Sequence, residues 1–161
     1  MEFAFTEDQL AITEAARGML LETCTAADLR KLSESGSDFD PSRWNTILEM
    51  GLLGMLVPET KGGLGMGLAD LIGIAEAAGY VGLPEPLVEM AGIVLPLLAG
   101  VEDDKGWLDK AISGQVISLS HPSNPYVTGL DQAAALLAIE SGELHVIARG
   151  DVAADRKESF D

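Results

Sequence analysis

FDPSRWNTILEMGLLG, residues 39–54, is the stretch that most clearly decides the fold. Asp40 followed by Pro41 is typical of a helix start, because Asp accepts backbone N–H bonds as an N-cap and the fixed φ of Pro suits the first helical position. Trp44 and the apolar residues three and four positions after it share one helix face. Gly51 stands where a left-handed residue ends such a helix. The stretch therefore predicts an amphipathic helix with well-marked ends.

Two more helices are predicted upstream of this stretch. Residues 6–9 read Thr-Glu-Asp-Gln, a capping box that starts a helix running to about Thr23. Thr25 and Asp28 are placed to cap a second, shorter helix that ends near Ser33. The amino-terminal part of the chain is therefore expected to be entirely helical.

Helices are also predicted downstream, after a loop with four glycines at residues 62–67. One should span about residues 68–79, the next should follow residues 83–86 and be kinked or ended by Pro96, and Asp103 or Asp104 should cap the last. The result is a bundle of five or six helices. Its predicted core includes Ile12, Met19, Trp44, Ile47, Leu71, Ile72, Val94, Trp107 and Leu108.

The sequence pattern changes from helical to strand-like after Gly114. Residues 115–120, 133–140 and 143–148 read as strands, and the last two are joined by Ser141-Gly142, a two-residue turn typical of tight hairpins. Helices first and strands last favour an α+β protein. We expect an all-α helical bundle over residues 1–114 and the beginning of an antiparallel β-domain over residues 115–161.

The composition is that of an ordinary globular protein, with 161 residues, 47% hydrophobic and 22% charged. A lone Cys24 forms no internal disulfide, so an oxidising compartment is not required. The net charge of −16 would repel a nucleic-acid backbone. Residues 1–8 lack the order of a signal peptide, and the longest apolar stretch is about half the roughly 20 residues that span a bilayer. These features predict a cytoplasmic protein that binds neither nucleic acid nor membrane.

Three motifs that could carry chemistry are each better explained structurally. Lys61 precedes the glycine loop, whereas a P-loop needs Lys and Ser or Thr after its glycines, so we expect an inter-helix turn with no ligand. His121 and His145 have no metal-ligand spacing around them. The serines near His121 lack a Gly-x-Ser-x-Gly elbow and an orienting carboxylate. No catalytic set and no metal site is predicted from the residues alone.

Several short segments occur in the order and spacing of one known family. They are residues 5–9, 39–44, 49–54, 58–59, 62–65, 75–79 and 111–114. Taken together they resemble the amino-terminal helical domain of acyl-CoA dehydrogenases, and Ser113-Gly114 looks like that family's entry into its β-domain. The resemblance implies a helical domain, a β-barrel-like middle domain and a carboxy-terminal helical bundle. It also implies FAD held between the last two domains and neighbouring subunits.

The resemblance assigns only a partial cofactor site to this chain. Ser118, Leu119 and Ser120 correspond to the family's flavin-contacting strand. Typical members have Thr-Glu-Pro and then Gly-Ser-Asp where this chain has Ser120-His121-Pro122 and residues 123–129, and their Trp-containing flavin segment has no counterpart here. The family's catalytic glutamate lies in the carboxy-terminal bundle, so no catalytic base is assigned. We expect a fragment that, alone, binds neither FAD nor acyl-CoA tightly and is inactive.

Two hypotheses of function follow. In the first, the chain is a subunit or fragment of an FAD-dependent acyl-CoA dehydrogenase, which introduces an α,β double bond into an acyl-CoA thioester. The shortened β-domain favours the non-catalytic partner in a heteromeric enzyme that acts on bulky thioesters such as steroid-derived ones, and a homo-oligomeric complete enzyme is the variant. In the second, the chain is a non-enzymatic binding or assembly module that keeps the helical domain for protein contacts.

Overall fold

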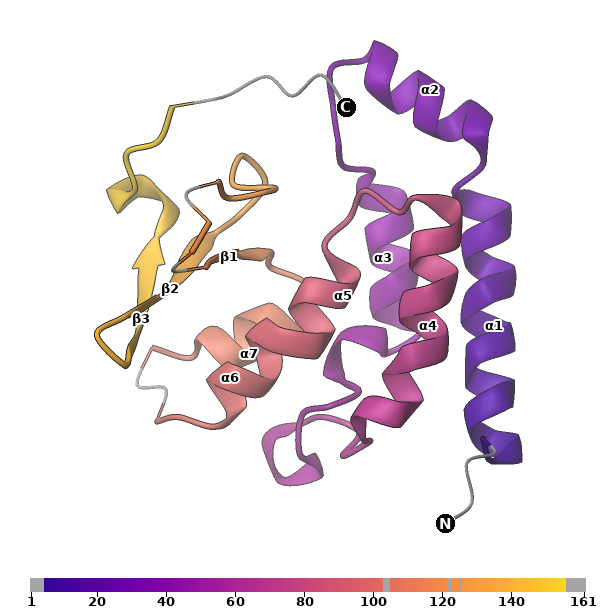
Figure 1. The fold of residues 1–161 in the computed structure, drawn as a ribbon, viewed down its shortest axis with the longest axis horizontal. Helices are drawn as coiled ribbons and strands as arrows, with labels where there is room; N and C mark the ends of the chain where they lie inside the picture. The colour runs from indigo at the N-terminus through magenta and orange to yellow at the C-terminus, as the bar shows by residue number, and fades with distance from the viewer. Residues whose placement is uncertain (1–4, 103–104, 122, 125, 156–161) are drawn as a thin grey trace.

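Helices come first and strands last along the chain, as Figure 1 shows in a computed structural model that describes residues 5–102, 105–121, 123–124 and 126–155. The helices are α1 (Glu7–Thr23), α2 (Ala26–Glu34), α3 (Pro41–Glu49), α4 (Leu68–Val81), α5 (Leu87–Glu89), the π-helical turn η3 (Met90–Val94), α6 (Leu95–Ala99) and α7 (Trp107–Ile112). Short 3₁₀ turns are η1 (Leu52–Gly54), η2 (Glu59–Lys61) and η4 (Arg149–Asp151). The strands are β1 (Ile117–Ser120), β2 (Ala135–Glu140) and β3 (Glu143–Ala148). The predicted α+β class is confirmed.

The first three helices begin where their capping residues predict. The Thr6 hydroxyl accepts from Gln9 N at 3.2 Å and the Gln9 side chain accepts from Thr6 N at 2.9 Å, which completes the capping box of α1. Asp40 Oδ1 accepts from Ser42 N at 2.8 Å at the start of α3, and Gly51 after its end is left-handed with φ 73°. Local chemistry alone therefore sets these helix ends.

The buried face of α4 differs from the predicted one. Leu71, Ile74, Ala77 and Ala78 are buried, whereas Ile72, which we placed in the core, is 56% exposed. The reason is the close approach of α1, because a side chain at Gly73 would collide with Thr13. Since Gly73 must face α1, the helix is rotated so that Ile72 points away from the core.

Most of the other predicted core residues are confirmed. The buried members are Trp44, Ile47, Leu71, Val94 and Leu108, and half-buried members packed against them are Ile12, Met19 and Trp107. Burial of each large apolar side chain contributes about 1.5–3 kcal/mol. The Trp44 indole N–H also donates to Gly114 O at 2.8 Å, which ties α3 to the end of the helical region.

Residues 87–99 form one continuous helical segment made of α5, η3 and α6. The helix does not end at Pro96, one of the two predicted outcomes, because it continues through Pro96 to Ala99. A kink at Pro96, the other outcome, stays a prediction. Pro96 lies in the first turn after the π-helical residues, where a missing N–H and a proline ring are accommodated more easily than in a regular helix interior.

The helix α7 begins after Gly106, which is left-handed with φ 66°. The predicted caps, Asp103 and Asp104, lie outside the described residues.

The strands form one sheet in the order β1-β2-β3. The predicted hairpin is confirmed, since β2 and β3 are antiparallel and Ser141 and Gly142 both have positive φ, 55° and 81°. The sheet is mixed, however, because β1 pairs with β2 in parallel, with Ile117 opposite Ala135. The 14-residue connection over 121–134 is long enough to reverse direction between parallel strands. A domain boundary at residue 114 stays a prediction, and side chains of β1 and β2 share the hydrophobic cluster of the helices.

Candidate functional site

The strand that carries the predicted site residues has one edge paired and one edge facing helices. Val116 O accepts from Ala134 N on the side of β2, so residue 118 also points its backbone groups toward that strand. Residues 117 and 119 point the other way, toward the helical segment of α5 and η3. There, Ile117 N lies 3.3 Å from Met90 Sδ, and Leu119 N donates to Glu89 Oε1 at 3.3 Å. Side chains of one helical segment thus cover the open edge of β1.

The three predicted cofactor-binding residues are consecutive on β1 but lie in different surroundings. Ser118 is 1% exposed, and its hydroxyl donates to Thr128 O at 2.9 Å. Leu119 is half-buried and its N–H is engaged by Glu89. Ser120 is half-buried at the end of the strand. Two of the polar groups expected to contact a ligand, the Ser118 hydroxyl and the Leu119 N–H, are therefore already bonded within the chain.

Glu89 is the functional candidate that sequence analysis missed. Desolvation by burial raises the pKa of its carboxyl above its ordinary value of 4.5, while the hydrogen bond from Leu119 N–H opposes that shift. A carboxylate can accept about four hydrogen bonds, so one backbone donor leaves it acceptor capacity. The sequence held one signal, because Glu89 is the single charged residue between Leu87 and Val101.

A hollow of about 240 Å³ lies beside Glu89, between the end of α4 and the start of α5. Small residues of α4 line one side, including Ala75, Ala78 and Gly79. Pro86, Val88, Glu85 and Glu89 line the other. The hollow is thus mostly apolar, and its charged lining residues are two glutamates.

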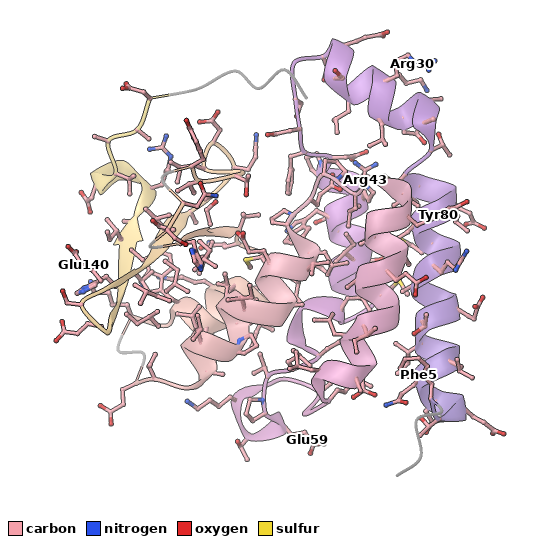
Figure 2. The ribbon with its side chains drawn as sticks, viewed as in Figure 1. Phe5, Arg30, Arg43, Glu59, Tyr80 and Glu140 are labelled. Carbon is pink, nitrogen blue, oxygen red and sulfur yellow. The ribbon has the colours of Figure 1, made fainter. Side chains whose placement is uncertain are left out.

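Both carboxylate oxygens of Glu85 are engaged by Arg43, whose place among the helices Figure 2 shows. Arg43 Nε and Nη2 donate to its two carboxylate oxygens at 2.7 Å each, Arg43 Nη1 donates to Thr23 O at 2.8 Å, and Asp40 N donates to Glu85 Oε1 at 2.8 Å. Burial alone would lower the pKa of Arg43, but the hydrogen bonds and charge of Glu85 outweigh it and raise that pKa. This buried pair joins α1, α3 and the α4–α5 connection.

The glycine-rich loop uses its own backbone groups. The N–H groups of Gly62, Gly63, Leu64 and Gly65 donate to carbonyls of residues 54–59 at 2.8–3.2 Å. A phosphate cradle needs such N–H groups free. The predicted interpretation as an inter-helix turn is therefore supported by the bonds themselves.

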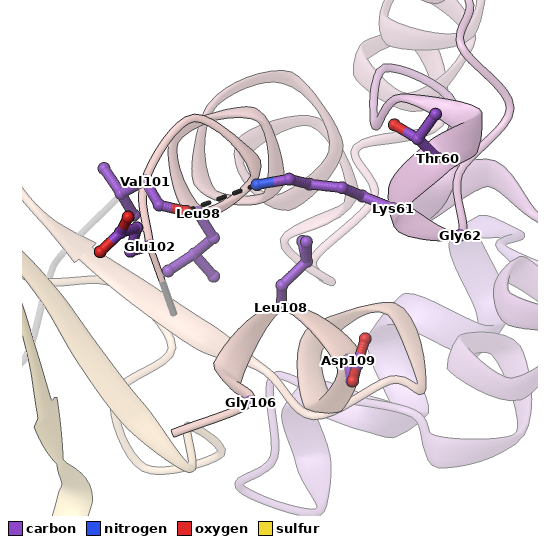
Figure 3. A pocket seen from close by; sticks show the side chains of 9 residues that line it. All are labelled: Thr60, Lys61, Gly62, Leu98, Val101, Glu102, Gly106, Leu108 and Asp109. Atoms are coloured by element: carbon purple, nitrogen blue, oxygen red, sulfur yellow. Dashed lines mark hydrogen bonds between the residues drawn. The ribbon is translucent and has the colours of Figure 1, made fainter. Parts of the chain in front are cut away.

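Lys61, beside this loop, also has structural partners. It lines an open cavity of about 550 Å³ with Glu102 and Asp109, and Figure 3 shows its side chain reaching toward Val101. Its ammonium donates to Ala99 O at 2.7 Å and to Val101 O at 3.5 Å, at the carbonyl end of α6. With two carboxylates in the lining, this cavity does not favour an anion.

The histidines lie apart from these features. Ser123 Oγ is 2.8 Å from His121 Nδ1 in an exposed loop, and His145 lies 3.8 Å from Glu143 on the exposed strand β3. Within the described ranges, no group of three or more His, Cys, Asp or Glu side chains is arranged to hold a metal ion. No helix formed by those residues is both long and apolar enough to cross a membrane.

The chain belongs to the acyl-CoA dehydrogenase family. Residues 6–115 match the family model described as acyl-CoA dehydrogenase, N-terminal domain. The chain is 27% identical over 139 residues to acyl-CoA dehydrogenase IpdE2 of Mycobacterium tuberculosis strain ATCC 25618 / H37Rv, a match that covers 86% of this chain and 44% of IpdE2. The chain thus spans less than half the length of this relative.

Solved structures share the fold. A chain of the ChsE4-ChsE5 complex from Mycobacterium tuberculosis superposes with a TM-score of 0.75 at 21% identity, over 93% of this chain and 49% of that one. A chain of the Tcur3481-Tcur3483 steroid ACAD superposes with a TM-score of 0.69 at 22% identity, over 82% of this chain and 44% of that one. At 93% coverage, the likeness to the chain of the ChsE4-ChsE5 complex extends beyond the helices, which end at Ile112, into the sheet.

The residues expected to contact FAD do not fit this cofactor in the chain by itself. The N–H of Leu119 is bonded to the Glu89 carboxylate, and the Ser118 hydroxyl is bonded to Thr128 O. A pyrophosphate bound beside Leu119 would be repelled by that carboxylate. Ser118, Leu119 and Ser120 therefore remain predicted site residues.

Proposed function

We propose that the chain is the helical and initial β portion of a subunit in a heteromeric acyl-CoA dehydrogenase, and that this subunit is the non-catalytic partner. The observation that carries the proposal is membership of the family combined with a strand β1 on which the Ser118 hydroxyl and the Leu119 N–H are already bonded within the chain. The reaction of the assembly is α,β-dehydrogenation of an acyl-CoA thioester. FAD is bound in the assembly, with the main contacts supplied outside this chain.

The solved relatives support a paralogous subunit as the partner. One is a complex of two named chains, ChsE4 and ChsE5, and the other pairs Tcur3481 with Tcur3483 and is described as a steroid ACAD. By likeness, the partner here is a second acyl-CoA dehydrogenase chain, which contributes the base, and the thioester carries a bulky acyl group. A cytoplasmic location and a homo-oligomeric form stay predictions.

The test uses the chain alone, a paralogous acyl-CoA dehydrogenase chain encoded beside it in the genome (its paralogous neighbour) alone, and both chains expressed together. In each case, reduction of an electron-acceptor dye by acyl-CoA thioesters is followed. We expect turnover of steroid side-chain thioesters when both chains are present and none with this chain alone. Turnover by this chain alone would contradict the non-catalytic role. Stable complex formation without turnover of any thioester would favour an assembly module instead.

A further inference from the structure

The hollow between α4 and α5 has the chemistry of a small binding site for one end of an apolar ligand. Ala75, Ala78 and Gly79 leave space on α4 where larger side chains would fill it, and Val88 adds an apolar wall from α5. Its volume of about 240 Å³ is below the roughly 300–1,000 Å³ of pockets that enclose a whole drug-sized ligand. It would therefore hold a single ring or a short branched end.

The acceptor available in this hollow is Glu89. Both oxygens of Glu85 are taken by Arg43, and Oε1 also accepts from Asp40 N, so Glu85 has little capacity for a ligand. Within the part of the chain that the structure describes, Glu89 accepts one hydrogen bond, from Leu119 N–H at 3.3 Å, and the residue is half-buried. A half-buried carboxyl with unused lone pairs is stabilised by a further hydrogen-bond donor.

The position of Glu89 is fixed by the helix that carries it. It is followed at once by the π-helical turn η3, and such turns occur often at functional sites. Met90 of that turn lies against Ile117 N, two residues before Leu119 on the strand. Glu89 therefore both lines the hollow and bonds the edge of β1 through its Oε1.

We propose that the hollow binds the ring end of an acyl group and that the Glu89 carboxyl accepts a hydrogen bond from a hydroxyl on that ring. That the ligand is an acyl group rests on the proposed function, whereas the preference for a hydroxyl rests on the hollow. Anionic ends are disfavoured because the charged residues that line the hollow are two glutamates, one of which, Glu85, already neutralises Arg43. Glu89 thereby becomes a specificity-determining residue for hydroxylated substrates.

Binding of three small probes to the isotope-labelled chain tests this directly by NMR. The probes are cyclohexylmethanol, its methyl ether, which has no donor, and cyclohexylmethylamine, which is a cation. The amides of Leu119 and Gly79 report on the carboxyl and on the hollow. We expect the alcohol to shift both amides and to bind at least about fivefold more tightly than the ether, the factor a single hydrogen bond supplies.

Variants separate recognition from structure. Glu89→Leu should reduce the preference for the alcohol to less than about twofold, and Glu89→Gln, which keeps an acceptor oxygen, should retain part of it. Glu76→Leu, an exposed control on α4 outside the lining, should keep the full preference. The amide spectrum of each variant shows whether it is folded.

Four results would overturn the inference: equal affinities for alcohol and ether, tighter binding of the amine, shifts confined to other residues, or no shifts up to the solubility limit. The dye assay on the assembled enzyme tests the proposed function independently of the probe binding. Thioester turnover with no probe preference removes the hollow as the recognition site and leaves the proposed function standing. A clear probe preference in an assembly that oxidises no thioester contradicts the assignment of the ligand as an acyl group.

Discussion

Removal of one partner from the buried Arg43–Glu85 pair should strongly destabilise the fold. The two side chains are 2% and 0% exposed, and their paired bonds of 2.7 Å are among the shortest side-chain bonds described. Glu85→Gln leaves the buried guanidinium charge with only the partly exposed Asp40 carboxylate, 3.8 Å away, as a counter-charge. A buried pair broken in this way costs about 3–5 kcal/mol, a large part of the roughly 5–15 kcal/mol by which a domain is stable.

Replacement of both partners should cost less than the sum of the single changes. In the double variant Arg43→Met with Glu85→Leu, no charge is left buried, and the remaining cost is the loss of partners for Thr23 O and Asp40 N, about 1–3 kcal/mol for each group left unsatisfied. The coupling energy of the double-mutant cycle should therefore be clearly favourable to the pair.

Urea unfolding followed by far-ultraviolet circular dichroism measures these free energies. Arg30→Met, an exposed change on α2, is the matched control and should stay within about 0.5 kcal/mol of the parent. A loss below about 1 kcal/mol for Glu85→Gln, the level of an exposed ion pair, would refute the view that this pair holds α1, α3 and the α4–α5 connection together.

Three further predictions rest on single contacts. Gly63→Ala should destabilise the fold, because its Cβ would collide with Val57 O, and a lower thermal midpoint checks this; an unchanged midpoint would mean that the loop can move aside. Trp44→Phe removes the part-buried bond to Gly114 O and should cost about 0.5–1.5 kcal/mol in urea unfolding, and no loss would show that the bond is not needed. Folding raises the pKa of Glu89 above 4.5, so the folded state favours the protonated carboxyl. The contribution of Glu89 to the free energy of unfolding is therefore fully present below pH 4.5 and is lost as pH rises through the folded pKa. Glu89→Gln should therefore gain stability relative to the parent from pH 4 to pH 7, and a constant difference in thermal midpoint would contradict this.

The parts of the fold that depend on neighbouring residues could be predicted from sequence. The capping residues Thr6 and Asp40 set helix starts through bonds to residues two or three positions on, so no tertiary information is required. The hairpin at Ser141 is equally local.

The parts of the fold that depend on contacts between distant residues could not be predicted from sequence. Leu68 and Ile72 match helical spacing on α4 as well as Leu71 and Ile74 do, and only the approach of α1 at Gly73 decides which face is buried. The parallel pairing of β1 with β2 is a choice of partner across a 14-residue connection, which strand patterns do not specify.

The candidate site was predicted only in part for the same reason. Its strand, Ser118 to Ser120, came from a family resemblance, but the Glu89 carboxyl that engages Leu119 N–H lies 30 residues earlier in the chain. An isolated acid in an apolar helix signals a special environment, yet its partner is visible only in the folded structure.

The flavin content of purified protein tests the central claim most directly. The chain should be purified alone and after co-expression with its paralogous neighbour. The visible absorbance of each preparation then gives the moles of FAD per mole of polypeptide. If the chain is the non-catalytic partner in a heteromeric acyl-CoA dehydrogenase, the chain alone is colourless and the co-purified complex is yellow. Stoichiometric FAD on this chain alone would contradict that account.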